Sequence, residues 1–476
     1  MSQTNIAEEI FSRADPDSVA VIEGETVWSY HDLNAHSAGI ADRLRPACKG
    51  IRAPRIGLLC HDGAGYIALA LGILRAGGCF VPIAPELTAA ERNHLVSTIA
   101  LDFLLTSDGG RNGKIDFQVE RVSAPAPPPW IGALAALNPA FIRFSSGTTG
   151  RSKGIVLSHD SLRARVEAAN SGLQIGPDDR VLWVLAMSHH FAVSIILYLW
   201  HGAAIVLPAS HLAGDILHSA TRHRATVLYA APFHYELLAG DAGQTRWPSL
   251  RLAVSTTATL AREIGAKFDR AFGVYPAQAL GIIEVGLPFL NVPDPRSRPD
   301  SVGPVQPTFA FELRDPQGNA VRPGEKGELF LKGPGLFDAY IAPWQERSAA
   351  LAAGWFSTGD IAHADAQGAL CLIGRNRSAI SFGGMKFFPE EVEAVLCEHP
   401  LVAEARVFGR PHPTFGMVPA AELVPAPGKP VPTSREILSF CRNRIARYKI
   451  PVEIAFVKKL ERTPSGKIKR NQTPDG

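Results

Sequence analysis

The residues of this chain with the clearest chemical potential form one loop, residues 144–154, with the sequence FSSGTTGRSKG. Small residues let the backbone approach an anion closely, the hydroxyl groups can donate to phosphate oxygens, and the lysine adds a positive charge. The candidate phosphate-binding residues are Ser145, Ser146, Gly147, Thr148, Thr149 and Lys153. The loop is not a Walker A motif, because Ser152 stands where that motif has its second Gly. An isolated stretch of this composition is also typical of a flexible polar turn.

Four further stretches follow the loop along the chain. Residues 280–284 read LGIIE, and residues 354–360 read GWFSTGD. A Gly-Arg pair at 374–375 is followed by Gly-Gly at 383–384 and by PEEVE at 389–393. Residues 464–468, near the C-terminus, read PSGKI. The five stretches together form a pattern that no single stretch would establish.

This pattern resembles the motifs of the adenylate-forming superfamily, which includes acyl- and aryl-CoA synthetases, adenylation domains of peptide synthetases and firefly luciferase. The resemblance implies that a carboxylate reacts with ATP to give acyl-AMP and pyrophosphate, after which a thiol attacks the mixed anhydride. The enzyme must hold two anions together and stabilise charge at the α-phosphate, mainly by positioning and electrostatics. The implied cofactors are ATP, Mg²⁺, and CoA or a phosphopantetheine carrier.

The resemblance also assigns roles to single residues. Lys467 would reach from a small domain to the α-phosphate and the acyl carboxylate, although it could be a solvated lysine of a basic tail. Asp360 would bind the ribose hydroxyls, with Arg375 beside the ribose or phosphate and Gly281 in the nucleotide site. Asp360 or Arg375 could instead belong to a structural ion pair. Glu284 would bind Mg²⁺, since a hard cation prefers oxygen ligands.

Several positions depart from the family pattern. Ile283 replaces the usual Thr before the glutamate, and Leu280 replaces an aromatic residue. Thr256 and Thr257 replace a Gly-Gly pair, which should narrow the space beside the adenine or the acyl chain. Arg377 stands at the hinge position, commonly Lys or Asp, and residues 381–384 lack lysines that many CoA ligases carry. These departures put the reaction rate and the thiol acceptor in question, but not the fold.

Residues 187–192, MSHHFA, align with the substrate pocket of the family. His189 resembles the residue that gates the pocket in aryl and acyl ligases, and we expect it to be catalytic, as we do Lys467 and Arg377. His190 stands where amino-acid adenylation domains have an Asp, which disfavours an α-amino acid because its ammonium would lack a counter-charge. The candidate substrate-binding residues are His190, Phe191, Thr256, Leu280 and Ile283. The alternative is a pair of hydrogen-bonded histidines on a buried helix.

Apolar runs indicate how these residues are positioned. Strands at 56–60 and 79–83 flank a buried helix at 66–76, and this βαβ order predicts a largely parallel sheet covered on both faces. Ser158 is expected to cap a helix at about 159–170. From about residue 300, short strands with Gly and Pro turns predict a β-rich subdomain, whereas Pro389 should open an acidic helix in a separate module.

The predicted fold is therefore α/β. Residues 1–376 would form a large domain of parallel-rich sheets flanked by helices, with its small β subdomain at about 300–376. Residues 377–476 would form a small, mobile α+β lid domain, with the boundary near Arg377. A Pro-rich connection at 123–130 is expected on the surface, just before the loop.

Composition excludes several functions. The 476 residues carry a formal net charge of +3 and no basic block of the size that nucleic-acid binding needs. The six cysteines show neither metal-ligand spacing nor a disulfide-dense pattern, so we expect the protein to reside in the reducing cytosol. The N-terminus does not resemble a signal peptide. Residues 191–207 are nearly all apolar but are divided by His201 and Gly202, which favours a buried helix and strand over membrane insertion.

Three functional readings remain open. The first is a ligase that joins an uncharged aryl or medium-chain acyl acid to CoA. The second uses the same first half-reaction but loads a separate carrier protein, which the missing lysines near Gly383 favour weakly. The third is a non-catalytic nucleotide- or acyl-binding protein, supported only by Ile283.

Overall fold

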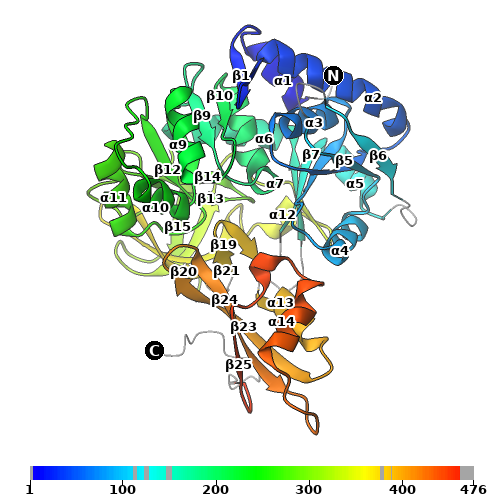
Figure 1. Ribbon diagram of the computed structural model, residues 1–476, viewed down its shortest axis with the longest axis vertical. Helices are drawn as coiled ribbons and strands as arrows, with labels where there is room; N and C mark the ends of the chain where they lie inside the picture. The colour runs from blue at the N-terminus through cyan, green and yellow to red at the C-terminus, as the bar shows by residue number, and fades with distance from the viewer. Residues whose placement is uncertain are drawn as a thin grey trace.

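A larger and a smaller lobe make up the computed structural model (Figure 1). The structure describes residues 4–110, 115–122, 128–145, 153–375, 380–387 and 389–460. Residues 376–379 lie outside these ranges, so the domain boundary predicted at Arg377 stays a prediction. The predicted architecture, a large α/β domain built on sheets and a small C-terminal domain, is confirmed.

The first large sheet has eight strands in the order β14-β13-β12-β11-β9-β10-β1-β2. The six strands from β13 to β1 run parallel to their neighbours, and β14 and β2 are antiparallel at the two edges. Their bounds are β1 Val19–Glu23, β2 Thr26–Ser29, β9 Arg180–Trp183, β10 Ala204–Leu207, β11 Val227–Ala230, β12 Leu252–Ser255, β13 Ala277–Ile282 and β14 Gly286–Leu290.

The second large sheet has the order β18-β17-β8-β7-β4-β3-β5-β6 and is parallel from β7 to β5. Its strands are β3 Arg55–Cys60, β4 Cys79–Ile83, β5 Phe103–Ser107, β6 Gln118–Arg121, β7 Pro139–Ser145, β8 Lys153–Ser158, β17 Ala339–Ile341 and β18 Gln345–Glu346. The βαβ unit predicted from the apolar runs is β3, helix α3 (Ala64–Arg75) and β4. Every residue of α3 from Ala64 to Leu74 is buried, because the helix is apolar on all faces.

A third, antiparallel sheet follows in the chain and has the order β15-β16-β19-β20. Its strands are β15 Ala310–Arg314, β16 Gly327–Lys332, β19 Phe356–Ala364 and β20 Leu370–Arg375. One core cluster joins all three sheets, with Val254 from the first, Phe80 from the second and Leu331 from the third. The β-rich part of the large lobe is therefore fastened to the same core as the two large sheets.

Helices cover the sheets, as Figure 1 shows. In the large lobe they are α1 Ile6–Arg13, α2 Tyr30–Cys48, α4 Ala89–Ile99, α5 Ile131–Ala136, α6 His159–Leu173, α7 Met187–His190, α8 Ile195–Trp200, α9 Ala213–Arg222, α10 Pro232–Gly240, α11 Arg262–Phe272 and α12 Arg347–Ala350. A 3₁₀ turn, η1, covers Phe191–Val193. Ser158 caps α6 as predicted, because its hydroxyl accepts the Ser161 N–H at 3.0 Å. Of the connection predicted at 123–130, residues 123–127 lie outside the described ranges.

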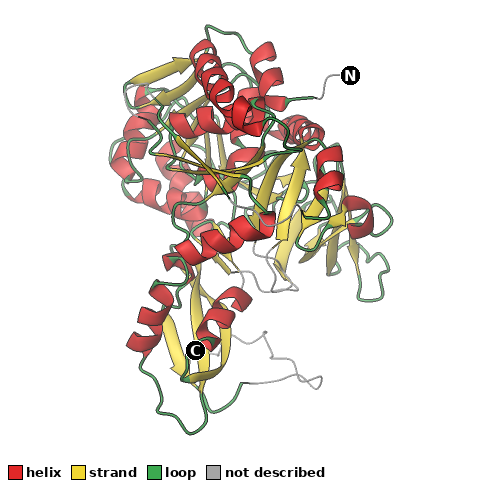
Figure 2. Cartoon of the chain, turned by 90° about the vertical axis from the view of Figure 1, so that its right-hand side faces the viewer, coloured by secondary structure: helices red, strands yellow, loops and turns green. Residues whose placement is uncertain are grey.

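The small lobe has its own sheet and core, and Figure 2 shows it as a separate body beside the large lobe. Its strands are β21 Ile380–Phe382, β22 Met385–Phe387, β23 Val402–His412, β24 Gly416–Pro425 and β25 Glu453–Phe456. Its helical elements are α13 Pro389–Cys397, α14 Ser434–Arg442 and the 3₁₀ turn η2 Arg447–Lys449. Proline opens α13, as the sequence predicts.

The apolar stretch at 191–207 forms η1, α8 and the buried strand β10, in agreement with the sequence analysis. Within the described ranges, no helix has both the length and the apolar character needed to cross a bilayer.

The first residue of α6, His159, gives a test of this fold. Its Nδ1 accepts the Ile6 N–H at 3.1 Å, which ties α6 to α1, and burial lowers its pKa to about 4. An unfolded histidine has a pKa of about 6.5, so the unfolded chain binds the proton first as the pH falls. The stabilisation is present above pH 6.5 and should decrease by about 2 kcal/mol between pH 7 and pH 5.

We expect His159→Gln to remove this contribution and so to reduce the pH dependence of the free energy of unfolding, measured by urea denaturation. His218→Gln, on an exposed position of α9, is the matched control and should keep the wild-type slope. Equal slopes for wild type and His159→Gln would contradict the prediction.

Candidate active site between the two lobes

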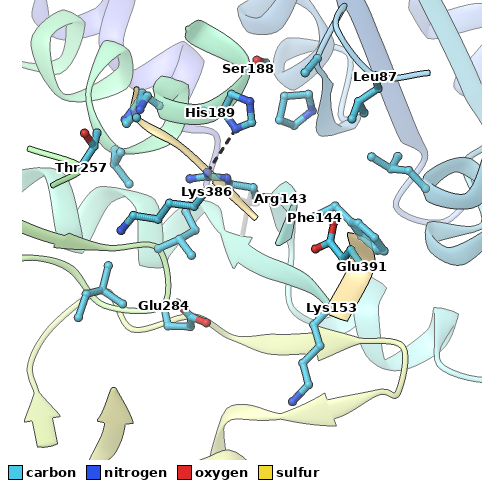
Figure 3. Close-up of a pocket in the computed structure, with 18 of the residues that line it drawn as sticks. Leu87, Arg143, Phe144, Lys153, Ser188, His189, Thr257, Glu284, Lys386 and Glu391 are labelled. Atoms are coloured by element: carbon cyan, nitrogen blue, oxygen red, sulfur yellow. Dashed lines mark hydrogen bonds between the residues drawn. The ribbon is translucent and has the colours of Figure 1, made fainter. Parts of the chain in front are cut away.

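A cavity of about 1130 Å³ lies between the two lobes and receives side chains from both. The strand ends of the large sheets, α4 and α7 form its walls on the large-lobe side, and α13, η2 and the β21–β22 hairpin form those on the small-lobe side. The lining residues that matter below are Glu91, Arg143, Lys153, His189, His190, Thr256, Thr257, Gly281, Ile283, Glu284, Tyr340, Gly384, Lys386, Glu391 and Lys449. Figure 3 labels ten of the residues that line the cavity.

The phosphate-loop end of the cavity is charged and polar. Lys153 begins β8, directly after the loop, and its ammonium lies 4.6 Å from the centre of the Tyr340 ring. The Tyr340 hydroxyl donates to Glu284 Oε1 at 3.3 Å. Burial and the nearby Glu284 carboxylate raise the pKa of Tyr340, so the phenol keeps its proton at neutral pH. A cation and a carboxylate thus flank one tyrosine, in an arrangement suited to a metal–phosphate ligand.

Short helix α7 carries His189, and the carboxylate of Asp62 holds its first residue. Asp62 accepts the N–H of Met187, the first residue of α7, at 3.0 Å. Burial raises the pKa of Asp62 to about 6, against the opposing effect of this hydrogen bond. His189 Nδ1 lies 3.5 Å from an Nη atom of Arg143, on the adjacent strand β7 (Figure 3). Burial, and then the positive charge of Arg143, lower the pKa of His189 to about 3, so His189 is neutral at physiological pH.

The opposite wall of the cavity is mostly apolar. Its members are Val166, Ala169, His190, Val193, Tyr229, Thr256, Ile282, Ile283 and Leu287. Burial holds the pKa of His190 well below its usual range, so this histidine is neutral. Arg165 also reaches the cavity, but its guanidinium donates to the carbonyl oxygens of Gly335 and Ile283. This wall therefore fits an apolar or weakly polar acyl group.

A hairpin of the small lobe closes the cavity near Thr257. The turn residues Gly383 and Gly384 both have positive φ (53° and 92°), as a two-residue type I′ turn requires. Beside the turn, the Ser381 hydroxyl donates to the Thr257 carbonyl oxygen at 3.2 Å. Thr257 itself has φ of 77°, which a β-branched residue rarely adopts. The threonine thus keeps a conformation that glycine favours, at the point where the small lobe meets the large one.

A buried ammonium joins the lobes at the other side of the cavity. Lys449 Nζ lies 2.7 Å from Glu91 Oε1 on α4 and 3.2 Å from Glu391 Oε2 on α13. Burial alone would lower the pKa of Lys449, but Glu391, Tyr448 and Glu91 outweigh it and raise the pKa above its ordinary value. The hydroxyl of Thr88, which caps α4, also donates to the Arg444 carbonyl oxygen at 3.1 Å. The N-terminus of α4 is therefore held by residues 444–449.

The structure brings many of the predicted site residues together. Those that line the cavity are Lys153, His189, His190, Thr256, Gly281, Ile283 and Glu284. Phe191 packs instead against the Tyr66 and Phe80 rings, and Leu280 and Asp360 lie buried behind the wall. Ser146, Gly147, Thr148, Thr149, Arg377 and Lys467 lie outside the described residues, as do the side chains of Ser145 and Arg375. Asp360 and Arg375 stand opposite each other in the backbone register of β19 and β20. The roles assigned to all these residues stay predictions.

Sequence reasoning missed Arg143, Lys386 and the Lys449 cluster. Arg143 had a usable signal, since it is the one charged residue in the apolar run at 141–144. Lys386 and Lys449 had none, because their position in the cavity depends on how the lobes sit against each other.

The fold and the cavity define a ligase of the adenylate-forming type. The family model described as AMP-binding enzyme matches residues 9–341, and the model of the AMP-binding enzyme C-terminal domain matches residues 391–467. The chain therefore belongs to the AMP-binding enzymes.

Its relatives agree with this assignment over nearly the whole chain. The chain is 28% identical to the indoleacetate–CoA ligase of Aromatoleum aromaticum, covering 96% of this chain and 94% of that protein. It is also 28% identical to a feruloyl-CoA synthase of Amycolatopsis, over 97% and 96% of the two chains. The structure of o-succinylbenzoate CoA synthetase from Bacillus subtilis, bound with a product analogue, matches with a TM-score of 0.85 and 25% identity over 99% and 98%. The predicted class, an AMP-forming acid–thiol ligase, is confirmed.

Replacing the buried lysine tests the contact between the lobes. Lys449→Met removes the cation between Glu91 and Glu391 and leaves two half-buried carboxylates close together. Breaking a buried ion pair costs about 3–5 kcal/mol, and partial solvent access should reduce this to about 2 kcal/mol. We expect the lobes to separate, seen as an increased radius of gyration in small-angle scattering.

The matched control is Arg410→Met, which removes a cation from an exposed ion pair with Glu453 inside the small lobe. It should leave the radius of gyration unchanged. An unchanged radius in Lys449→Met as well would show that this ammonium does not hold the lobes together.

Proposed function

We propose that this protein activates an uncharged aryl or medium-chain acyl acid with ATP and transfers the acyl group to CoA. One observation carries the proposal: a single cavity has Lys153 and Glu284 at the phosphate-loop end and a neutral, largely apolar wall around His190 at the other. The acids in the names of the two curated relatives, indoleacetate and ferulate, are both aromatic and support this choice. Among the described residues, none in the wall around His190 is acidic, which disfavours an α-amino acid.

Magnesium fits the site as a companion of ATP. Glu284 offers a carboxylate, and within the described part of the chain no group of three or more His, Cys, Asp or Glu could hold a metal by itself. A Mg²⁺ ion at Glu284 would therefore take most of its ligands from phosphates and water, as Mg²⁺ in nucleotide sites does. When bound, it would neutralise phosphate charge.

In the first half-reaction, a carboxylate oxygen of the acid attacks the α-phosphorus of ATP and pyrophosphate leaves. Two anions must approach each other, so the site's contribution is to supply cations and to exclude water. Lys153 follows the phosphate loop directly, and Lys467 would bridge the α-phosphate and the carboxylate. Neutral His189 can position the carboxyl group without adding charge.

In the second half-reaction, the thiolate attacks the carbonyl carbon of acyl-AMP, forming a thioester and releasing AMP. The thiol must therefore reach this carbonyl carbon from the protein surface. Glu91, Glu391 and Lys449 line the part of the cavity that lies between the lobes. We place the long pantetheine arm of CoA there. A carrier protein would present the same arm, and the experiment below separates the two.

The first experiment is ATP–pyrophosphate exchange with benzoates, cinnamates, medium-chain fatty acids and amino acids. We expect exchange with one aryl or acyl class and none with α-amino acids, because the wall has no carboxylate for an ammonium group. Thioester formation with the accepted acid is then measured against CoA concentration. Saturation at micromolar to millimolar CoA supports the CoA ligase, whereas product formation only with an added carrier protein contradicts it. Exchange with amino acids alone would overturn the choice of acid.

Lys467 gives a residue-level test. Lys467→Ala should lower the rate of exchange by about 100- to 1000-fold, because removing one transition-state donor has effects of that size. ATP affinity, measured by calorimetry, should stay close to that of the wild type. Lys469→Ala, two residues away in the same basic tail, should keep normal exchange. Equal effects of the two substitutions would remove Lys467 from the reaction.

A further inference from the structure

Arg143 stands apart from the other charged residues that line the cavity. It lies on β7, between the phosphate loop and the acyl wall, and is enclosed by protein while part of its surface stays open to the cavity. Within the described part of the chain, no ion pair joins Arg143 to a carboxylate, and its partner is the neutral ring of His189 at 3.5 Å. A guanidinium in such a place is suited to an anion that arrives with the substrates.

His189 adds a further hydrogen-bond donor beside Arg143. The Arg143 N–H can only donate, so the Nδ1 atom that faces it acts as the acceptor and the proton of the neutral ring lies on Nε2. The pair therefore presents guanidinium N–H groups and one imidazole N–H, all of them donors. Burial lowers the pKa of Arg143 to about 10, which still leaves it charged at neutral pH.

We propose that Arg143, oriented by His189, binds the reacting carboxyl group of the acid substrate and stabilises the charge on its oxygens during both half-reactions. The inference rests on the proposed function and adds to it the residue that receives the carboxylate. Arg143 thereby becomes a catalytic residue of this chain.

Three anions could bind Arg143: the reacting carboxyl group, a second acidic group of the substrate and the outer phosphates of ATP. The position of Arg143 favours the reacting carboxyl group. Arg143 lines the cavity at the junction of its two ends, since it interacts electrostatically with Glu284 at one end and with His190 at the other. The carboxyl group must occupy this junction, because its oxygen becomes bonded to the α-phosphorus. A second acidic group at the far end of the acid would meet the neutral wall around His190 instead. The outer phosphates belong near Lys153 and Glu284.

The test compares an acid with its neutral isostere. A benzoate or cinnamate accepted in the exchange assay and its primary carboxamide are each bound to the full-length enzyme in the presence of α,β-methylene ATP, with calorimetry as the readout. Hydrogen bonds to charged groups favour the carboxylate by about 10- to 100-fold in the wild type. In Arg143→Met this preference should vanish or reverse, because a buried carboxylate would lack its counter-charge.

Two further variants separate binding from folding. Arg143→Lys keeps a charge and should retain part of the preference, and added guanidinium should restore activity to Arg143→Ala. Arg444→Met, which removes another cation from the cavity wall, is the matched control and should keep the wild-type preference. The rate of exchange in Arg143→Met should fall by about 100- to 1000-fold.

The outcomes are distinct. Loss of the acid preference in Arg143→Met, with guanidinium rescue of Arg143→Ala, supports the inference. A retained preference with a lowered melting temperature would make Arg143 structural and overturn it. If Arg143→Met lost the preference only for acids that carry a second carboxylate, Arg143 would bind that distal group, and the inference would be overturned. A wild type that exchanges with no acid would instead refute the proposed function, since the comparison would then have no substrate.

Discussion

The cavity is enclosed where the small lobe rests on the N-terminus of α4, and the ammonium group of Lys449 joins the two lobes there. Lys449 lies between Glu91 of the large lobe and Glu391 of the small lobe, with most of its surface excluded from water. Such a cluster gains Coulomb energy in a low-dielectric place but loses hydration on three groups, so its net worth is modest. A contact of this kind is specific in geometry without being strong. It would allow two bodies to assemble one site and to separate again.

The second contact between the lobes shows how local strain is maintained. Thr257 has the positive φ expected of glycine, and its carbonyl oxygen accepts the hydroxyl of Ser381 from the β21–β22 hairpin. A threonine in this conformation costs of the order of 1–3 kcal/mol and persists only where its surroundings determine it. A Cβ atom added at Gly384 would lie within van der Waals distance of the Thr257 side chain, so the glycine turn and the strained threonine are close neighbours. Both threonines at 256–257 line the cavity, and their methyl groups occupy space that glycines would leave open.

Local rules explain what the sequence could predict. The βαβ unit around α3 follows from apolar runs, the cap of α6 from Ser158, and the start of α13 from Pro389, because each depends on neighbours in the chain. Motif spacing likewise places Lys153, His189 and Glu284 at one cavity. Phe191 and Leu280 show the limit of this reasoning: both are apolar, and only packing decides whether such a side chain faces the cavity or the core. Glu91 and Lys449 are separated by more than 350 residues in the chain, so their pairing follows from lobe contact alone.

Charge balance connects the contact between lobes to the chemistry. The reaction joins a carboxylate to a phosphate in a place where water is excluded, so cations must be present before the anions arrive. Arg143 and Lys153 belong to the large lobe and remain in the cavity however the small lobe moves, whereas Lys386 enters it from the hairpin of the small lobe. Movement of the small lobe would thus change the number of cations around the bound anions without any residue titrating. Burial holds the pKa values of His189 and His190 below the usual range, so both stay neutral across physiological pH. The two histidines therefore do not change the charge that the large lobe contributes to the cavity. Such a movement, rather than a change in pH, would then alter how strongly the cavity binds anions.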